Sequence, residues 1–218
     1  MNRRVLSMTS RREVLLFGLS ANPPTGLSGH MGVISHCRSF KRQLAPFHHR
    51  VEMCRLALQS LTQYRNDGAQ LKVVEEEREM FESMAAKSDC PEQLRLGSID
   101  LVQFLLEKHP DTSFTMLLGG DTHEDLLAGK WKRGDELMQL VKLLVVDRKG
   151  VESHWRQEQD TQDRVTYVNV PQLSDVSSTM VRGTADRALL EKCLDSSVLE
   201  YIEKNKLYAF VETEEEEN

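Results

Sequence analysis

The chain has 218 residues, of which 39% are hydrophobic and 28% are charged, and these values suit one α/β domain with a full core. The formal net charge of -6 argues against a general nucleic-acid binder, because affinity for phosphate backbones comes from clustered Lys and Arg. No apolar run reaches the roughly 20 residues that a membrane span needs. The four cysteines are scattered without a Cys-x-x-Cys pair, which indicates reduced thiols in a cytoplasmic protein.

The first stretch with a clear pattern is a strand that leads into a ligand loop. Glu13–Leu19 is an apolar run containing Gly18, and a proline-stiffened turn at Asn22-Pro23-Pro24 follows it. The pair Gly29-His30 then opens a predicted helix that runs to about residue 40. Unpaired amides at the start of such a helix stabilise an anion, and His30 adds a donor that can be cationic. The pattern is typical of a phosphate-binding loop.

The next helix follows without an intervening strand. Phe47–Leu58 has helical apolar spacing, and no strand-like run separates it from the helix predicted to end near residue 40. A parallel sheet normally gains its second strand in this interval. We therefore expect a sheet that lacks the strand beside its first.

The middle of the chain predicts a short strand, a loop and a helix. Leu71–Glu75 indicates the strand, and the acidic run Glu75–Glu79 marks its exit. The mixed composition of Met80–Gln93 predicts a loop. Gly97–Lys108 then has the apolar spacing of a helix.

A continuous apolar run predicts the next strand. Phe114–Leu118 has the pattern of a strand buried on both faces, and it ends in Gly119-Gly120-Asp121. Ligands of open α/β sheets lie outside the carboxyl ends of the strands. Two glycines there leave room for a ligand to approach the backbone, and Asp121 offers a carboxylate to ribose hydroxyls.

Two further strands and a tryptophan complete the sheet region. Val141–Val146 predicts a strand that is followed by Arg148, and Arg164–Val170 alternates well enough for a last strand. Trp131 lies between two lysines and offers an aromatic face, although packing in the core is the ordinary role of a tryptophan.

A second anion-binding motif follows the last strand. Ser177-Ser178-Thr179 is a signal for a helix N-cap, and Arg182 comes four residues after Ser178. Residues four apart share one face of a helix, so Ser178 and Arg182 can converge on one anion. The motif is typical of a clamp for a triphosphate. A helix at Ser197–Asn205 and the pair Leu207-Tyr208 end the predicted structure.

Together the two motifs resemble the nicotinamide or nicotinic acid mononucleotide adenylyltransferases. That family has a Phe-Asn-Pro-Pro-Thr turn before a Gly-His pair, and Ala21 stands here in place of Phe. Leu207-Tyr208 is similar to its terminal Leu-Tyr element. The resemblance covers most of the chain and implies an α/β fold with a Rossmann-like, doubly wound parallel sheet. It implies a single nucleotidyltransferase domain over residues 1–211, with a basic extension at 1–12 and an acidic, disordered tail at 212–218.

The resemblance also implies a reaction and a set of site residues. AMP would pass from ATP to a pyridine mononucleotide, with Mg²⁺ bridging phosphate oxygens and no metal ligand assigned to the protein. The implied catalytic residues are His30 and Arg182. The implied ATP-binding residues are Gly18, Leu19, Ser20, Gly29, His30, Ser177, Ser178, Thr179 and Arg182. The implied mononucleotide-binding residues are Ser20, Asn22, Gly119, Asp121, Trp131 and Arg148.

Two alternatives stay open on the sequence alone. One is another small-molecule nucleotidyltransferase, such as a pantetheine-phosphate adenylyltransferase or a cytidylyltransferase. The other is a nucleotide-binding protein without turnover. The expected partners are small molecules rather than nucleic acid or membrane, and the oligomeric state stays open, a homo-oligomer included.

Overall fold

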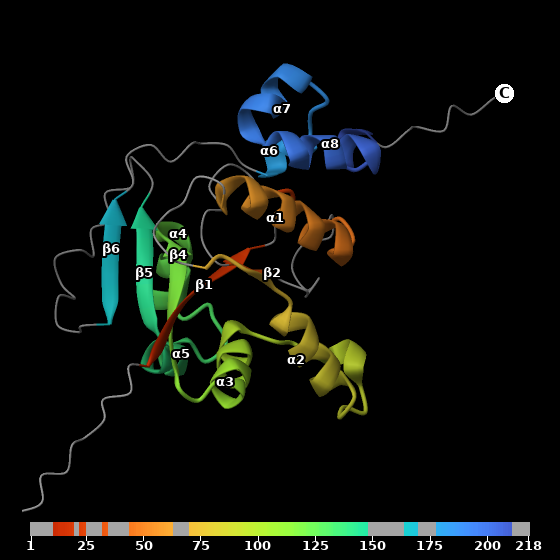
Figure 1. Cartoon of the computed structure of the whole chain (residues 1–218). Coiled ribbons are helices and arrows are strands. Elements are labelled where there is room, and N and C mark those ends of the chain that lie inside the picture. Colours follow the sequence, from red (N-terminus) through yellow and green to blue (C-terminus); the bar gives the residue numbers. More distant parts are fainter. Residues whose placement is uncertain are drawn as a thin grey trace, which may run out of the picture.

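A six-stranded parallel sheet organises the protein (Figure 1). The computed structural model describes residues 11–19, 22–24, 32–34, 44–62, 70–147, 164–169 and 178–210. The strands lie in the order β3-β2-β1-β4-β5-β6, and every neighbouring pair is parallel. Their bounds are β1 (Arg12–Leu19), β2 (Gly32–Ile34), β3 (Val73–Val74), β4 (Thr112–Gly119), β5 (Lys142–Asp147) and β6 (Val165–Asn169). The predicted α/β class with a parallel sheet is confirmed.

The strand beside β1 is present, and the expectation that the sheet would lack it is wrong. Residues 32–34 pair with β1, where Phe17 lies opposite Gly32, and with β3, where Val33 lies opposite Val74. The predicted helix over residues 29–40 is therefore wrong at these three positions, and its other residues lie outside the described part of the chain. Two adjacent β-branched residues, Val33 and Ile34, favour extended backbone, and pairing on both sides overrides the helical spacing.

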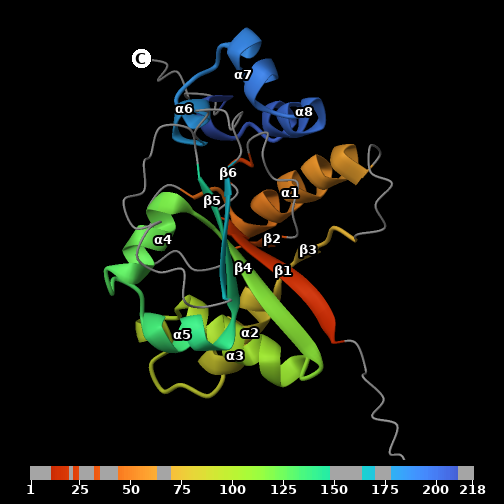
Figure 2. The ribbon, with the colours of Figure 1, turned by 90° about the vertical axis from the view of Figure 1, so that its left-hand side faces the viewer.

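Helices cover both faces of this sheet. Figure 2 shows α4 and α5 on one side of the sheet and α1 on the other, with α6, α7 and α8 beside α1. The helix bounds are α1 (Phe47–Thr62), α2 (Glu76–Ala85), α3 (Ser98–Lys108), α4 (Gly120–Leu127), α5 (Gly134–Leu140), α6 (Ser178–Arg182), α7 (Arg187–Cys193) and α8 (Ser196–Lys204), with short 3-10 turns at η1 (Pro91–Gln93) and η3 (Tyr208–Phe210). This arrangement is doubly wound. Within the described residues, no helix is both long and apolar enough to cross a membrane.

The larger core lies between the sheet and α3 to α5. Ile99, Leu126 and Leu137 from these helices lie in one buried cluster with Leu143 and Val145 of β5. Along β4, every second residue is buried and the alternate residues are only partly buried. The prediction of a strand buried on both faces is thus wrong in degree, because the described residues cover one face of β4 more fully than the other.

A second core joins α1 to the C-terminal helices. Met53 of α1 is fully buried, and it packs in one cluster with Val198, Leu199 and Ile202 of α8. The carboxylate of Asp195 accepts a hydrogen bond from the backbone N–H of Ser197 at 3.0 Å and thereby caps α8. This cluster fixes the C-terminal layer on α1, next to the carboxyl edge of the sheet.

The acidic segment after β3 is a helix, and the loop predicted for Met80–Gln93 is wrong over its first six residues. α2 runs from Glu76 to Ala85, and Met80 within it is 1% exposed. Three glutamates lie in its first turn, where negative charge is stabilised by the helix dipole. A helix with one deeply buried side chain has too little apolar periodicity to be recognised from sequence.

Candidate active site

The ends of β1 and β4 lie at one edge of the sheet. Leu16 pairs with Met116 in parallel register, and Gly18 and Gly119 follow that pair by two and three residues. Both glycines therefore lie at the carboxyl edge, where open α/β sheets bind ligands. Apart from its chain neighbours, no described atom lies within 4 Å of the position that a Cβ of Gly18 would take. Among the described residues, nothing therefore prevents a ligand from approaching Gly18 closely.

The turn at Asn22-Pro23 is held by α6. The Ser178 hydroxyl donates to the carbonyl oxygen of Pro23 at 2.9 Å, and Nη1 of Arg182 donates to the carbonyl oxygen of Asn22 at 2.8 Å. Nη2 of Arg182 also donates to the Thr179 hydroxyl at 3.1 Å. The two predicted anion-binding motifs are therefore in direct contact.

Asn22 has a structural role that its predicted contact with substrate did not include. The residue is 3% exposed, and its Oδ1 accepts the backbone N–H of Ala45 at 2.9 Å and the hydroxyl of Tyr208 at 2.9 Å. Sequence reasoning assigned no role to Tyr208. The Leu207-Tyr208 pair was visible, but nothing in its spacing indicates a partner that lies 186 positions earlier.

Arg50, in the first turn of α1, supports the same turn through Ala45. Arg50 is 1% exposed, its Nε donates to the carbonyl oxygen of Ala45 at 3.1 Å, and its guanidinium lies 5.3 Å from the centre of the Phe47 ring. Ala45 in turn donates to Asn22. A buried guanidinium with these contacts stabilises the segment that leads from Ala45 into α1.

The second glycine at the carboxyl edge makes room for Asp121. A Cβ on Gly119 would lie 2.8 Å from Oδ1 of Asp121, which is closer than real carbon and oxygen atoms approach. Asp121 is exposed in the first turn of α4, and the Thr122 hydroxyl donates to it at 3.4 Å. The carboxylate therefore lies over the end of β4, at the edge where it was predicted to meet a ribose.

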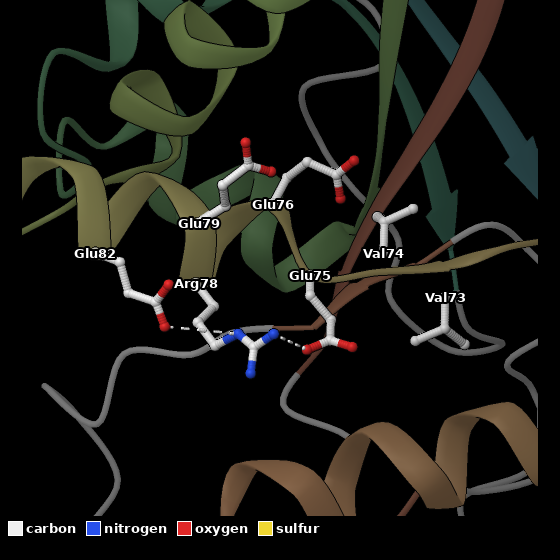
Figure 3. Close-up of a pocket in the computed structure, with 7 residues that line it drawn as sticks. All are labelled: Val73, Val74, Glu75, Glu76, Arg78, Glu79 and Glu82. Carbon is white, nitrogen blue, oxygen red and sulfur yellow. Dashed lines mark ion pairs between the residues drawn. The ribbon is translucent and has the colours of Figure 1, made fainter.

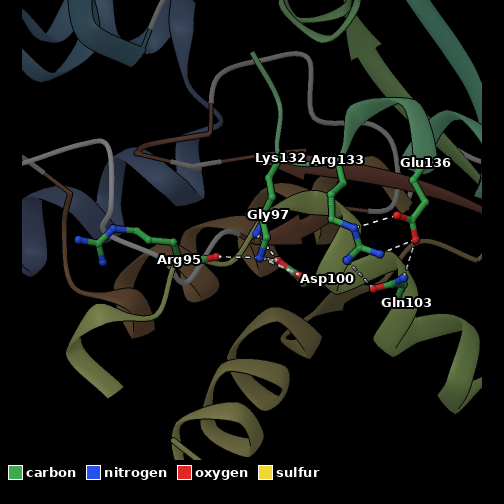
Figure 4. A network of polar contacts seen from close by, with 7 residues as sticks. All are labelled: Arg95, Gly97, Asp100, Gln103, Lys132, Arg133 and Glu136. Atoms are coloured by element: carbon green, nitrogen blue, oxygen red, sulfur yellow. Dashed lines mark hydrogen bonds and ion pairs between the residues drawn. The ribbon is translucent and has the colours of Figure 1, made fainter. Parts of the chain in front are cut away.

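Trp131 is half-buried and packs against the larger core. The next residue, Lys132, is tied to α3: its ammonium lies 2.8 Å from Oδ2 of Asp100 and donates to the carbonyl oxygen of Arg95 at 3.2 Å (Figure 4). The same Asp100 oxygen accepts the backbone N–H of Gly97 at 2.7 Å. One carboxylate thus links the segment that carries Trp131 to the start of α3.

A second contact fixes the other side of this segment. Arg133 adopts left-handed backbone with φ 51°, and its Nε donates to Glu136 at 2.8 Å. Glu136 also accepts the side-chain amide of Gln103 at 3.1 Å, as Figure 4 shows. Trp131 is therefore presented by a segment anchored at two points on α3.

A cavity of about 400 Å³ lies beside the edge strand of the sheet, between β3 and α2 (Figure 3). Four glutamates and Arg78 line it together with Val73 and Val74. Arg78 is already paired, with Glu75 at 2.8 Å and with Glu82 at 3.8 Å. Glu75 also pairs with Arg55 and Glu79 with Lys108, so the four glutamates outnumber the three cations that pair with them. This excess of negative charge disfavours a triphosphate, so the cavity does not fit the predicted nucleotide.

Several predicted site residues lie outside the described part of the chain. These are Ser20, Gly29, His30, Ser177 and Arg148. Leu19 is described only by its backbone at the end of β1. The described members of the predicted site are Gly18, Asn22, Ser178, Thr179, Arg182, Gly119, Asp121 and Trp131, and the hydrogen bonds bring Asn22, Ser178, Thr179 and Arg182 together.

The chain is similar to known proteins of one family. Residues 29–184 match the cytidylyltransferase-like family. The nicotinate-nucleotide adenylyltransferase of Bacillus subtilis is 30% identical over 161 residues, which cover 73% of this chain and 70% of that protein. A Streptococcus pneumoniae protein named a probable nicotinate-nucleotide adenylyltransferase is 32% identical over 169 residues, covering 77% of this chain and 68% of that protein.

The fold has solved counterparts as well. The structure of Plasmodium falciparum nicotinic acid mononucleotide adenylyltransferase complexed with NaAD superposes with a TM-score of 0.66 at 22% identity, covering 91% of this chain and 98% of that one. This likeness shows the Rossmann-like fold. The family match and the two relatives show more: the chain belongs to the nicotinate-nucleotide adenylyltransferases, within the cytidylyltransferase-like family of nucleotidyltransferases.

Proposed function

We propose that this chain transfers the adenylyl group of ATP to nicotinic acid mononucleotide or its amide, forming deamido-NAD or NAD and releasing pyrophosphate. The observation that carries the proposal is the contact of Ser178 and Arg182 with the Asn22-Pro23 turn. It joins a hydroxyl and a guanidinium, both suited to phosphate oxygens, to the turn that follows β1.

The reaction is an in-line displacement at phosphorus. A phosphate oxygen of the mononucleotide bonds to the α-phosphorus of ATP, the bond from that phosphorus to the bridging oxygen breaks, and pyrophosphate leaves. Positioning and charge neutralisation account for such a step. In our proposal His30 and the amides near Gly29 neutralise the α-phosphate, while Ser177, Ser178 and Arg182 hold the departing pyrophosphate.

The mononucleotide lies on the β4 side of the site in this proposal. Asp121 accepts hydrogen bonds from ribose hydroxyls, with Gly119 leaving room for it. Trp131 stacks on the pyridine ring, and Arg148 contributes to binding of the mononucleotide. The half-burial of Trp131 supports the stacking role because the side chain packs on the core and still keeps exposed surface.

Mg²⁺ is proposed to accompany the triphosphate rather than to be held by a protein cage. Within the described residues, no three His, Cys, Asp or Glu side chains come together as a metal site. Magnesium often keeps most of its waters and binds phosphate oxygens with few protein ligands. The ion would supply further charge neutralisation on the phosphates.

We further propose that residues 1–211 form one nucleotidyltransferase domain in the cytoplasm. The contact between Asn22 and Tyr208 supports a single unit, since it joins residues near both ends of that range.

The proposed cytoplasmic location is supported by the cysteines. Cys54, Cys90 and Cys193 are free thiols, which suits a reducing compartment.

The test is a product assay with purified protein. ATP and Mg²⁺ are incubated with nicotinic acid mononucleotide, nicotinamide mononucleotide or pantetheine phosphate, and CTP replaces ATP in a parallel arm. We expect pyrophosphate and a pyridine dinucleotide in equal amounts. A folded protein that makes product from neither pyridine mononucleotide overturns the proposal. Product only in the pantetheine or CTP arm identifies a different transferase, and ATP binding without product identifies a nucleotide-binding protein.

A further inference from the structure

Tyr208 lies beside the turn after β1 although it belongs to η3, far along the chain. Its hydroxyl lies 2.9 Å from Oδ1 of Asn22 and 4.0 Å from Sδ of Met53. The backbone N–H of Ala45 lies 2.9 Å from the same oxygen. An amide N–H can only donate, so the atom facing it is the carbonyl oxygen of the Asn22 side chain. The Tyr208 hydroxyl must therefore donate its proton to Asn22.

The backbone holds Tyr208 in an unusual conformation. Its φ is 61°, and Lys206 two residues earlier has φ 50°. Left-handed backbone costs roughly 1 kcal/mol or more for a residue with a side chain, and it persists where the surroundings over-determine it. Here Leu207 between them is buried, and its N–H donates to the carbonyl oxygen of Ile202 at 3.0 Å. The tyrosine is thus aimed at the turn by a rigid support on α8.

The hydroxyl stays protonated and able to donate. Burial raises the pKa of Tyr208, and this effect outweighs the opposing influence of the nearby Arg182 and Arg50 guanidinium groups. The raised pKa keeps the phenol neutral near pH 7, so its hydroxyl can donate to Asn22 there.

We propose that Tyr208 is a positioning residue for adenylyl transfer. Its hydroxyl fixes the side chain of Asn22, and the backbone carbonyl oxygen of Asn22 in turn orients the guanidinium of Arg182. The inference rests on the proposed function. Each link is a direct contact: Tyr208 donates to the side chain of Asn22, and Arg182 donates to its backbone carbonyl at 2.8 Å. A misplacement of about 1 Å in a group that holds the reacting phosphates can lower the rate about 100-fold.

Two tyrosine variants test this role. Tyr208→Phe removes the hydroxyl and keeps the ring. Tyr201→Phe is the matched control, since Tyr201 is also half-buried in the C-terminal layer. Its hydroxyl forms a hydrogen bond of 2.9 Å as well, but with Nδ1 of His49 instead of the turn. For each variant, kcat, the KM for ATP and the melting temperature are measured on the full chain. Amide hydrogen exchange at Ala45 reports how firmly Asn22 is held.

We expect Tyr208→Phe to lower kcat about 10- to 100-fold, with the KM for ATP changed less than about 3-fold. Tyr201→Phe should leave kcat near the wild-type value, and it should shift the melting temperature by about as much as Tyr208→Phe does. Exchange at Ala45 should become faster only in Tyr208→Phe. Equal kinetic effects in the two variants, or no loss of kcat in Tyr208→Phe, overturn the inference.

The failure of the proposed function gives a different result. If the wild-type chain forms no dinucleotide, the proposed function falls, and Ala45 exchange alone decides the positioning of Asn22. Faster exchange in Tyr208→Phe but not in Tyr201→Phe then upholds the link from Tyr208 to the turn. Unchanged exchange overturns it.

Discussion

Arg182 donates through Nη1 to the carbonyl oxygen of Asn22 at 2.8 Å, across 160 positions of sequence. The residue expected to hold the triphosphate thus also holds the turn that follows β1. A ligand that engages Arg182 is thereby coupled to this turn without any intervening element. The geometry around Arg182 therefore governs both halves of the proposed site.

Replacing Arg182 with lysine should impair turnover although the positive charge is kept. A lysine lacks the planar fork that reaches Asn22 and Thr179 at once. Losing one hydrogen bond of a charged group costs about 1.5 to 3 kcal/mol, so we expect kcat/KM for ATP to fall roughly 10- to 100-fold. Steady-state kinetics measure the effect. Arg187→Lys is the control, because Arg187 pairs with Glu191 of α7 and Glu203 of α8. An equal loss there would contradict the role of Arg182.

His30→Ala should lower turnover far more than affinity for ATP. In the proposed reaction His30 stabilises charge that develops on the α-phosphate, and a group that acts in the transition state affects kcat more than ground-state binding. Single-turnover rates and the dissociation constant for ATP separate the two quantities. A parallel fall in both would assign His30 to simple nucleotide binding.

Lys132→Met should weaken binding of the pyridine mononucleotide and spare ATP. The change removes the contact of Lys132 with Asp100 and frees the segment that carries Trp131. We expect the KM for the mononucleotide to rise roughly 3- to 10-fold, which corresponds to about 1 kcal/mol for a partly exposed pair. Lys130 lies two residues before Lys132 and forms an exposed pair with Asp125. Lys130→Met removes this pair and should leave both KM values unchanged. A rise in the KM for ATP alone would contradict the assignment of this segment to the mononucleotide.

Met53→Ala should destabilise the protein by about 2 to 5 kcal/mol, because the side chain is fully buried between α1 and the C-terminal layer. Met84→Ala is the control: Met84 is 36% exposed on α2 and its loss should stay within about 0.5 kcal/mol. Urea denaturation followed by circular dichroism measures both. Similar losses for the two methionines would show that the second core contributes little.

His49 should make stability depend on pH in the mildly acidic range. Burial, helped by the neighbouring His48, holds the pKa of His49 below its ordinary value of 6.5. The unfolded chain then binds the proton more readily than the folded one, so stability is retained above 6.5 and is lost as the pH falls through that value. We expect the melting temperature to drop between about pH 7.5 and pH 5.5, and His49→Gln to reduce this drop. An unaltered pH profile in His49→Gln would exclude the histidine as its source.

The sequence was most informative where the physical signal is local. The apolar runs at β1, β4 and β5 are continuous, and the motif at Ser178 and Arg182 requires only helical spacing, so these features could be predicted. β2 could not, because three residues acquire their strand conformation from pairing with β1 and β3. α2 was missed because one buried methionine among glutamates carries little periodicity.

The contacts within the site were beyond sequence reasoning for another reason. Asn22 belongs to a recognisable turn, yet its partners Ala45, Arg182 and Tyr208 come from three distant parts of the chain. No spacing rule relates such positions, since the fold alone brings them together. The motif therefore identified Asn22 and Arg182 as important residues but assigned both to the ligand, whereas the structure also joins them to each other.

The 186 positions between Asn22 and Tyr208 have a consequence for biosynthesis. Ribosomes add about 5 to 20 residues per second, so on the order of 10 to 40 s pass between the synthesis of these two residues. Throughout that interval the nascent chain holds the first half of its nucleotide site without the hydroxyl that secures it. The turn should therefore be held firmly only once Tyr208 has left the ribosome, so amide exchange at Ala45 should be faster in ribosome-bound chains stalled before Tyr208 than in the released chain.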